Sequence, residues 1–255
     1  MIPKIIHMTW FGNDPFPPLV LKCMKSWKRY LPDYQIMIWT KDNYNLNINP
    51  WVSEAYSAKK YAFVSDFARF DVLYNYGGVY LDSDVEILKS LNNLLYNHAF
   101  AGFMTIPNII EGEVIGAEKG HPFLQKMMSY YQNKHFNTPN GDLNMKPLPE
   151  IIFDILNSEQ VILEPVDQNV FGVHLYPPGF FVYHRDVILV KTAYDTMYSY
   201  HYGAGLGWRL KNNGISGKIF HSYVEHGLDI IKLTKKIGIS KIHKKIILFL
   251  LKNLD

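Results

Sequence analysis

Two aspartates near the end of a short apolar run are the first candidates for a chemical role. Asp82 and Asp84 are separated by one serine in the segment GGVYLDSDVEIL, residues 77–88. Two carboxylates that close repel each other, and each raises the cost of ionising its neighbour. A bound cation removes that cost. A D-x-D triplet alone is expected about once by chance in a chain of this composition, so the surrounding residues must decide.

A helix-like segment stands directly ahead of the two aspartates. An apolar stripe runs at helical spacing from Phe63 to Tyr74, and Asp66 and Arg69 lie on its flank. A guanidinium in this place could bind a phosphate, and a carboxylate could accept hydrogen bonds from the hydroxyls of a sugar. The alternative is an ordinary ion pair on a helix surface, worth roughly 0.2–0.5 kcal/mol. The two residues alone leave both interpretations open.

The elements that must position these residues alternate between strand and helix. We expect strands at 3–12, 34–40 and 78–87, and helices at 17–32, 53–78 (in two pieces), 121–133 and 147–157. This order predicts an α/β fold with a mostly parallel central sheet and helices on both faces. Extended pieces around 161–183 would complete the sheet. Ligands bind beyond the carboxyl ends of the strands in such sheets, and the two aspartates lie at that end of the third strand.

The block YAFVSDFARFDVLYNYGGVYLDSDVEIL, residues 61–88, resembles the sugar-nucleotide-binding block of the family 32 glycosyltransferases. It is also similar to the glucosyltransferase domains of large clostridial toxins. The resemblance joins a Ser-Asp-x-x-Arg helix, a Gly-Gly-x-Tyr link and the D-x-D triplet in order. It extends to IPKIIHMTWFG at 2–12 and, more weakly, to IGAEKGHPFL at 115–124. The resemblance implies a single GT-A-like domain, here residues 1–228, and metal-assisted transfer from a nucleotide sugar with retention of configuration.

The resemblance also implies roles for the residues of the block. Asp66 would hold hydroxyls of the donor sugar, and Arg69 would reach the sugar or the diphosphate. Tyr80 would be a neighbour of the donor. Asp82 would contact the ribose or sugar and a metal-bound water, whereas Asp84 would ligate the metal directly.

Three further site residues are expected outside the block. Trp10 would stack on the nucleotide base, although a core aromatic residue is the alternative. His201, in YHYGAGLGW, is the candidate for a further metal ligand, and Trp208 could close over the diphosphate. The family commonly shows paired histidines shortly before Ser-Trp, a pattern absent here, so His221 and His226 compete for the role. An imidazole ligand favours Mn²⁺ over Mg²⁺.

No residue presents itself as a retaining nucleophile. The leaving diphosphate could take the proton of the acceptor, with positioning supplying most of the rate. Asp167 and Gln168 are possible acceptor-side groups, and an ordinary loop is the alternative.

Two other functions compete with transfer. The run VYLDSDVEIL also looks like the aspartyl-nucleophile motif of haloacid-dehalogenase-type phosphatases, but Glu86 occupies the place where that motif usually has Thr or Val. A later lysine and acidic pair that this chemistry needs were not found. The other possibility is a protein that binds sugar nucleotides without activity. The complete set of Asp66, Arg69, Asp82 and Asp84 favours an enzyme.

Composition restricts the partners and the compartment. The chain has 255 residues, a net charge of +3 and a single cysteine, Cys23, so no internal disulfide can form. The N-terminus lacks a basic leader with a long apolar stretch, and the run IILFLL at 246–251 is far short of a membrane span. We therefore expect a cytoplasmic enzyme.

The positive charge is concentrated at the end of the chain. Residues 229–255 hold seven Lys and two Asp, and the rest of the chain is net negative. The lysines alternate with aliphatic residues, which is typical of a basic amphipathic helix on an anionic membrane and not of a nucleic-acid-binding segment. The alternative is a terminal helix packed on the body. We expect a lipid-linked glycan acceptor of bacterial capsule or O-antigen synthesis, and a UDP-sugar donor.

Overall fold

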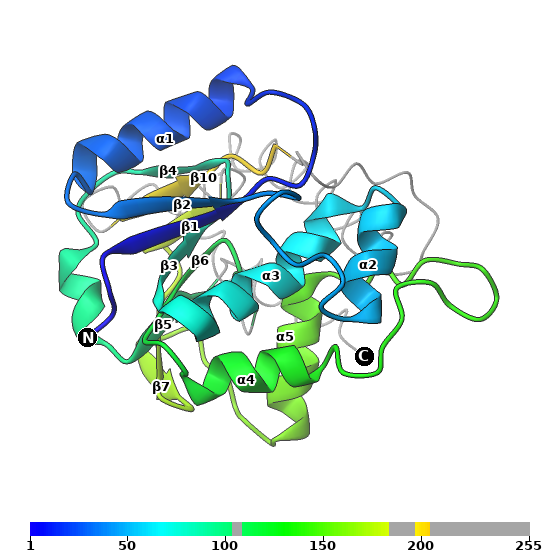
Figure 1. Ribbon diagram of the computed structural model, residues 1–255. Coiled ribbons are helices and arrows are strands. Elements are labelled where there is room, and N and C mark those ends of the chain that lie inside the picture. Colours follow the sequence, from blue (N-terminus) through cyan, green and yellow to red (C-terminus); the bar gives the residue numbers. More distant parts are fainter. Residues whose placement is uncertain (104–108, 184–196, 205–255) are drawn as a thin grey trace, which may run out of the picture. The chain divides into compact units, whose positions relative to one another are not determined.

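The computed structural model describes residues 1–103, 109–183 and 197–204 of the chain (Figure 1). The helices in these ranges are α1 (Pro18–Tyr30), α2 (Pro50–Ser57), α3 (Tyr61–Tyr76), α4 (Pro122–Ser129), α5 (Leu148–Ser158) and the 3₁₀ helix η1 (Asn92–Tyr96). The strands are β1 (Ile5–Thr9), β2 (Gln35–Trp39), β3 (Gly78–Leu81), β4 (Val85–Ile87), β5 (Ala99–Gly102), β6 (Val114–Ala117), β7 (Gln168–Val170), β8 (Val173–Tyr176), β9 (Phe181–Tyr183) and β10 (Ser199–His201).

Seven of these strands form one sheet in the order β2-β1-β3-β6-β5-β8-β7. β1 is parallel to β2 and β3, and β5 is parallel to β8. β6 is antiparallel to β3 and β5, and β7 is antiparallel to β8. Five of the seven strands therefore run in one direction. The mostly parallel sheet of the expected α/β fold is confirmed, with β6 and β7 as its two reversed strands.

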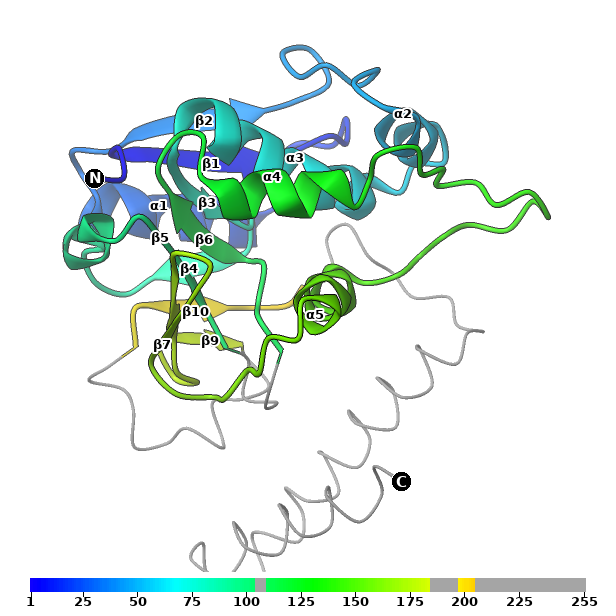
Figure 2. The same ribbon diagram turned by 90° about the horizontal axis from the view of Figure 1, so that it is seen from below.

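Helices cover both faces of this sheet, as expected. Alternate residues of β3 point to opposite faces: Val79 and Leu81 join the cluster built on α1, and Tyr80 joins the cluster built on α3, α4 and α5. Figures 1 and 2 show α1 on one side of the sheet and α4 on the other. α3 therefore lies on the face to which Tyr80 points.

The expected single strand over 78–87 is wrong. β3 ends at Leu81, and the chain turns through the D-x-D triplet before β4 begins at Val85, with the Val85 amide donating to the Asp82 carbonyl at 3.0 Å. β4 belongs to a separate three-stranded sheet, in the order β4-β10-β9. The turn is stabilised because Val85 is buried and its carbonyl accepts a hydrogen bond from the Trp27 indole at 2.8 Å. The two aspartates thus sit on a turn between two sheets.

Two glycines let α3 pass directly into β3, as the sequence predicted. Gly77 and Gly78 have φ values of 66° and 116°, which residues with a β-carbon rarely adopt. A β-carbon on Gly78 would lie 2.6 Å from the Ile5 carbonyl oxygen of β1. The close approach of α3, β1 and β3 therefore requires glycine at this position.

Several predictions concern residues outside the described ranges. Trp208, His221, His226, the basic segment 229–255 and the boundary between 1–228 and 229–255 all fall there. They stay predictions. Within the described residues, no helix is both long and apolar enough to span a membrane.

Candidate active site at the D-x-D turn

Arg69 is the centre of a buried ionic cluster at the end of β3. Its Nη2 donates to Asp66 Oδ1 at 3.0 Å and lies 3.5 Å from Asp82 Oδ1. Its guanidinium stacks over the Tyr80 ring, 4.6 Å from the ring centroid, and Nη1 donates to the Gly112 carbonyl. The Tyr80 hydroxyl in turn donates to Asp82 Oδ1 at 3.0 Å. The structure therefore brings together the four residues that the sequence assigned to donor binding at this turn.

The environment of Asp66 differs from that of a surface ion pair. Asp66 and Arg69 are both buried, with exposed fractions of 9% and 5%. Burial raises the pKa of the Asp66 carboxyl to about 7, against the opposing charge of Arg69. The alternative of an ordinary helix-surface pair does not fit, because such pairs remain in solvent.

Asp84 has a different set of partners from Asp82. Its Oδ1 lies 3.1 Å from His201 Nε2, and its Oδ2 accepts from the Ala204 amide at 2.7 Å. Burial opposes ionisation, yet the hydrogen bonds from His201 and Ala204 keep the pKa of Asp84 below its usual value. Burial likewise opposes protonation of His201, but the hydrogen bond and charge of Asp84 raise its pKa to about 9. Asp84 and His201 therefore form a buried pair.

β10 is the element that delivers His201 to Asp84. It pairs antiparallel with β4, and this register places His201 opposite Val85, the residue after Asp84. The Tyr202 amide then donates to the Asp84 carbonyl at 3.1 Å. A histidine more than a hundred residues away in the chain is thereby fixed beside the turn.

The donor atoms at Asp84 and His201 fit a divalent cation of the Mn²⁺ type. A carboxylate oxygen and an imidazole nitrogen are both accepted by Mn²⁺, provided that the imidazole loses its proton. Asp82 Oδ1 is instead engaged by Tyr80 and lies near Arg69. Among the residues the structure describes, no group of three His, Cys, Asp or Glu side chains is arranged around a common point. Such a cation would need further ligands from substrate or water.

Trp10 lies at the same edge of the sheet as the D-x-D turn. It follows the last residue of β1, which is parallel to β3. Its indole donates to the Asp14 carbonyl at 2.8 Å, and its ring packs edge-on against Phe16 at 5.2 Å. Trp10 is half-buried and lines a depression of about 430 Å³ together with Thr40 and residues of the 12–16 loop. Part of the Trp10 ring therefore faces this depression and does not pack in the core.

Two glutamates at the site were missed by the sequence analysis. Glu113 directly precedes β6, and its carbonyl accepts from the Asp82 amide at 2.9 Å, so the two residues stand opposite each other. Glu111 and Glu113 are 3% and 5% exposed. Both oxygens of Glu111 and Oε1 of Glu113 lack hydrogen-bond partners within the described part of the chain.

The charge of Glu113 is affected by its neighbours at the site. Burial raises its pKa to about 7, while the charges of His201 and Arg69 act in the opposite direction. The signal in the sequence was the pair of acids in EGEVIGA, at the start of an apolar strand. Buried unpaired carboxyls are rare in structural cores and cluster at functional sites.

The possible acceptor-side residues Asp167 and Gln168 are not brought to the turn. Gln168 begins β7, which is four strand positions from β3 in the sheet, roughly 19 Å at about 4.8 Å per position. The Asp167 carboxylate lies 3.1 Å from His174 Nε2 instead. Asp167 lies in the bend directly before β7, and an acceptor-side role for the two residues stays a prediction.

The turn and its cluster lie within a segment that matches a known family. Residues 17–101 match the family described as the glycosyltransferase sugar-binding region containing a D-x-D motif. About a third of the chain is thus similar to a glycosyltransferase sugar-binding region. This matched segment contains Asp66, Arg69, Tyr80, Asp82 and Asp84. The family resemblance drawn from the sequence is confirmed, and a dehalogenase-type phosphatase is disfavoured.

Two curated relatives to which this chain is similar are yeast enzymes. One is inositol phosphoceramide mannosyltransferase 3 of Schizosaccharomyces pombe, 36% identical over 140 residues, which cover 53% of this chain and 39% of the relative. Another is the mannosyl phosphorylinositol ceramide synthase CSH1 of Saccharomyces cerevisiae, 32% identical over 132 residues, which cover 50% and 35%. The chain thus spans less than half the length of these relatives.

One solved structure to which this chain is similar is the PaToxG glycosyltransferase. It is 19% identical to this chain, with a TM-score of 0.47, and the aligned part covers 62% of this chain and 70% of that one.

Proposed function

We propose that the protein is a metal-dependent glycosyltransferase that moves a sugar from a nucleotide-sugar donor to a hydroxyl group of a lipid-linked acceptor. The observation that carries the proposal is the convergence of Arg69 with Asp66 and Asp82 at the turn after β3, inside the glycosyltransferase sugar-binding region. In the proposed complex, Asp66 and Asp82 accept hydrogen bonds from sugar or ribose hydroxyls. Arg69 faces the diphosphate.

The charges at the turn support a requirement for a cation. Asp82 alone offsets the charge of Arg69, and ionisation of Asp66 would make the cluster net negative, so these three residues offer a diphosphate no net positive charge. Asp84 and His201 would hold a divalent cation, for which Mn²⁺ is the first choice. When bound, the cation supplies positive charge beside the departing diphosphate. Arg69 adds a fixed positive charge in the same place, where negative charge develops as the bond to the sugar breaks.

Retention of configuration remains part of the proposal. The acceptor hydroxyl would attack from the face that the diphosphate leaves, and Arg69 and Asp66 would hold donor and sugar in place for this step. Glu113 lies opposite Asp82 and could receive a hydrogen bond from a sugar hydroxyl.

The names of two relatives guide our choice of the donor sugar and the acceptor. Two yeast relatives are named for mannosyl transfer to inositol phosphoceramide or for synthesis of its mannosylated product. Mannose and an inositol-phosphate lipid are therefore our preferred sugar and acceptor, ahead of a bacterial capsule or O-antigen intermediate. We expect the nucleotide of the donor to be a uridine diphosphate, and a donor screen tests this expectation.

A thermal-shift screen tests the donor site. The full chain is mixed with GDP-mannose, UDP-glucose, UDP-galactose or CMP-sialic acid, each with and without Mn²⁺. A donor at 100 times its dissociation constant should stabilise the fold by about 2.7 kcal/mol, and only with the metal present. Asp84→Asn should lose the metal-dependent part. Asp142→Asn, a substitution of an exposed aspartate in a distant loop, is the matched control.

A transfer assay then tests the reaction. The best donor is offered with an inositol-phosphate lipid or with a polyprenyl-diphosphate glycan. Formation of a glycosylated inositol lipid supports the proposal in its preferred form. Donor stabilisation that is independent of metal and unchanged in Asp84→Asn contradicts the proposed site. Donor binding without transfer to either acceptor would favour a binding protein, and release of phosphate without transfer would favour a phosphatase.

A further inference from the structure

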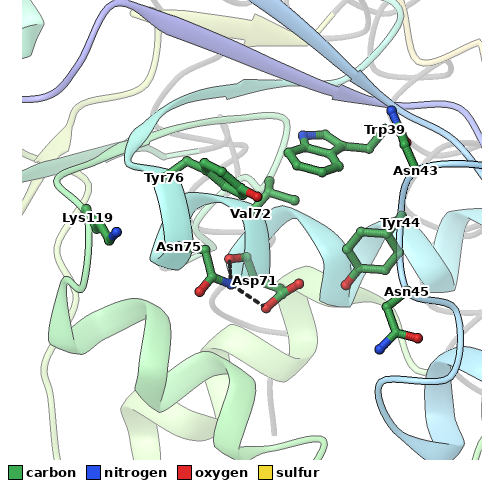
Figure 3. Close-up of a pocket in the computed structure, with 9 residues that line it drawn as sticks. All are labelled: Trp39, Asn43, Tyr44, Asn45, Asp71, Val72, Asn75, Tyr76 and Lys119. Carbon is green, nitrogen blue, oxygen red and sulfur yellow. Dashed lines mark hydrogen bonds between the residues drawn. The ribbon is translucent and has the colours of Figure 1, made fainter.

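A second depression lies at the other flank of α3, beside the edge strand β2 (Figure 3). It has a volume of about 380 Å³ and is formed by the end of β2, the loop that follows and the last two turns of α3. Its principal wall residues are Trp39, Tyr44, Asn45, Asp71, Asn75 and Tyr76. None of these residues is used by the site at the D-x-D turn.

The depression is separate from that turn. At 100° per residue, Asp71 projects from α3 about 140° away from Asp66, and Asn75 projects about 120° away from Arg69. In the sheet, β1 stands between β2 and β3. Helix and sheet thus place the depression and the D-x-D turn on different sides of α3.

The walls of the depression are aromatic and held in place. The Trp39 ring centroid is 5.3 Å from that of Tyr76 and 6.3 Å from that of Tyr44. The Trp39 indole donates to His7 Nδ1 at 3.0 Å, so its orientation is fixed from behind. Tyr76 is 47% exposed and presents its ring to solvent. Such rings offer a flat apolar surface against which the C–H face of a sugar can pack.

Polar side chains stand between these rings. Asn75 Nδ2 donates to the Asp71 carboxylate and to the Asp71 carbonyl, both at 2.9 Å, which turns the Asn75 amide oxygen away from Asp71 (Figure 3). The Tyr44 hydroxyl faces the Asp71 carboxylate and favours its ionised form, against the opposing effect of burial on the pKa of Asp71. Carboxylate and amide oxygens are acceptors for ligand hydroxyls. The depression thus presents several hydrogen-bonding groups within an aromatic frame.

The charged groups that line the depression indicate which class of ligand could bind there. Its lining contains one carboxylate, Asp71, and one ammonium group, Lys119, which Figure 3 shows at the far end of the depression. A phosphate site would need converging cations or amide N–H groups, and a lipid chain would need an apolar lining. An uncharged ligand with many hydroxyls and one apolar face fits both the charge and the aromatic walls.

We propose that this depression is a carbohydrate-binding site for one pyranose ring of a glycan, distinct from the donor site at the D-x-D turn. The pyranose stacks its C–H face on Tyr76, and its hydroxyls donate to Asp71 and Asn75. The site does not depend on the proposed transferase activity.

Saturation-transfer NMR with the full chain tests the site, using methyl α-D-mannopyranoside and methyl α-D-glucopyranoside as probes. At least one glycoside should bind with a dissociation constant on the order of 1 mM, typical of a small ligand with few contacts. The signal should persist in Asp84→Asn and in the presence of the best nucleotide sugar with Mn²⁺. These two arms separate this site from the donor site. Absence of saturation transfer, or displacement by the nucleotide sugar, would overturn the proposal.

Paired substitutions locate the binding. Asn75→Ala should weaken glycoside binding about two- to tenfold, the effect of losing one hydrogen bond or two. Tyr76→Ala should weaken it at least as much by removing the stacking surface. Asn157→Ala on α5 and Tyr96→Ala at the end of η1 are matched exposed controls and should bind as the parent does. Unchanged binding in Asn75→Ala contradicts the proposal even if Tyr76→Ala fails to fold.

Discussion

Asp82 and Asp84 stand two residues apart, but their carboxylates serve different partners. Asp82 is hydrogen-bonded to Tyr80 and lies beside Arg69, whereas Asp84 is paired with His201 and the Ala204 amide. The turn between β3 and β4 sends the two side chains to different neighbours. This separation relieves the repulsion that a continuous strand end would impose on them.

Arg69→Lys tests the guanidinium at the D-x-D turn. Arginine contacts Asp66 and the Gly112 carbonyl through different nitrogens and stacks on Tyr80, and a lysine ammonium cannot make these contacts together. We expect the transfer rate to fall about 10- to 150-fold, since charged hydrogen bonds are worth about 1.5–3 kcal/mol. The measurement is the transfer assay, with circular dichroism to verify folding. Arg29→Lys, on the surface of α1, should leave the transfer rate unchanged. Equal transfer rates in the two variants would show that the Arg69 guanidinium is not needed for transfer.

Glu113→Gln tests the buried glutamate opposite Asp82. The amide keeps the size of the side chain and removes the cost of burying an ionisable carboxyl group whose Oε1 has no hydrogen-bond partner among the described residues, so the melting temperature should rise. If Glu113 contacts substrate, the transfer rate should fall at least about tenfold in the same variant, a trade of activity against stability. Calorimetry and the transfer assay measure the two effects. A stabilised variant with full activity would show that Glu113 is not needed for transfer, and exposed Glu164→Gln should change neither.

At the scale of elements, His7 joins β1 to β2 and to the α3–β3 junction. Its Nδ1 accepts a hydrogen bond from the Trp39 indole at 3.0 Å, so this nitrogen carries no proton, and its Nε2 donates to the Gly77 carbonyl at 2.8 Å. The ring is therefore neutral. Burial lowers the pKa of His7 below its ordinary value of 6.5, against the opposing effect of the Gly77 carbonyl.

A pH dependence of stability follows from this neutral ring. Because the pKa of His7 is lower in the folded state, its contribution is fully present above pH 6.5. The contribution is lost as the pH falls through the lowered pKa, by about 1.4 kcal/mol for each unit of lowering. Urea unfolding at pH 5 to 8 should show a steeper acid loss in the parent than in His7→Gln. Other titrating groups are common to both proteins, so parallel curves would contradict the prediction.

At the scale of the whole molecule, charge is distributed unevenly along the chain. Residues 229–255 carry five net positive charges, although they lie outside the described residues. A lipid-linked acceptor would present its hydroxyls at a membrane surface. The basic, aliphatic composition of this segment therefore agrees with the proposed acceptor, and peripheral binding at the cytoplasmic face of a membrane stays a prediction.

Reversal of two charges tests this prediction in the full chain. Lys244→Glu with Lys245→Glu should weaken sedimentation with phosphatidylserine vesicles at least about tenfold, because each basic residue near an anionic surface contributes about 1 kcal/mol. The matched control is Lys25→Glu with Lys28→Glu on the exposed face of α1. Equal loss of vesicle binding in both variants would indicate a general charge effect. No loss of vesicle binding in either variant would contradict the prediction and favour the alternative, a terminal helix packed on the body.

Local patterns predicted much of the first half of the fold. Helical spacing and the flanking prolines and glycines predicted α1 and α3, and the apolar runs predicted β1 and β2, because these signals arise from neighbours within a few residues. The prediction failed over 78–87, where apolar residues stand on both sides of the D-x-D triplet and read as one strand. Whether an apolar run stays in one sheet depends on what it packs against, here Trp27 of α1, and that partner is distant in the chain.

The glycosyltransferase resemblance and four side chains of the block could be found without a structure, because Asp66, Arg69, Asp82 and Asp84 lie close together in a recognisable order. Which of them share partners could be seen only in the folded chain. Sheet register brings Glu113 opposite Asp82, and a strand from the second half of the chain carries His201 to Asp84. Such contacts depend on backbone pairing across the whole chain, and no local pattern encodes them.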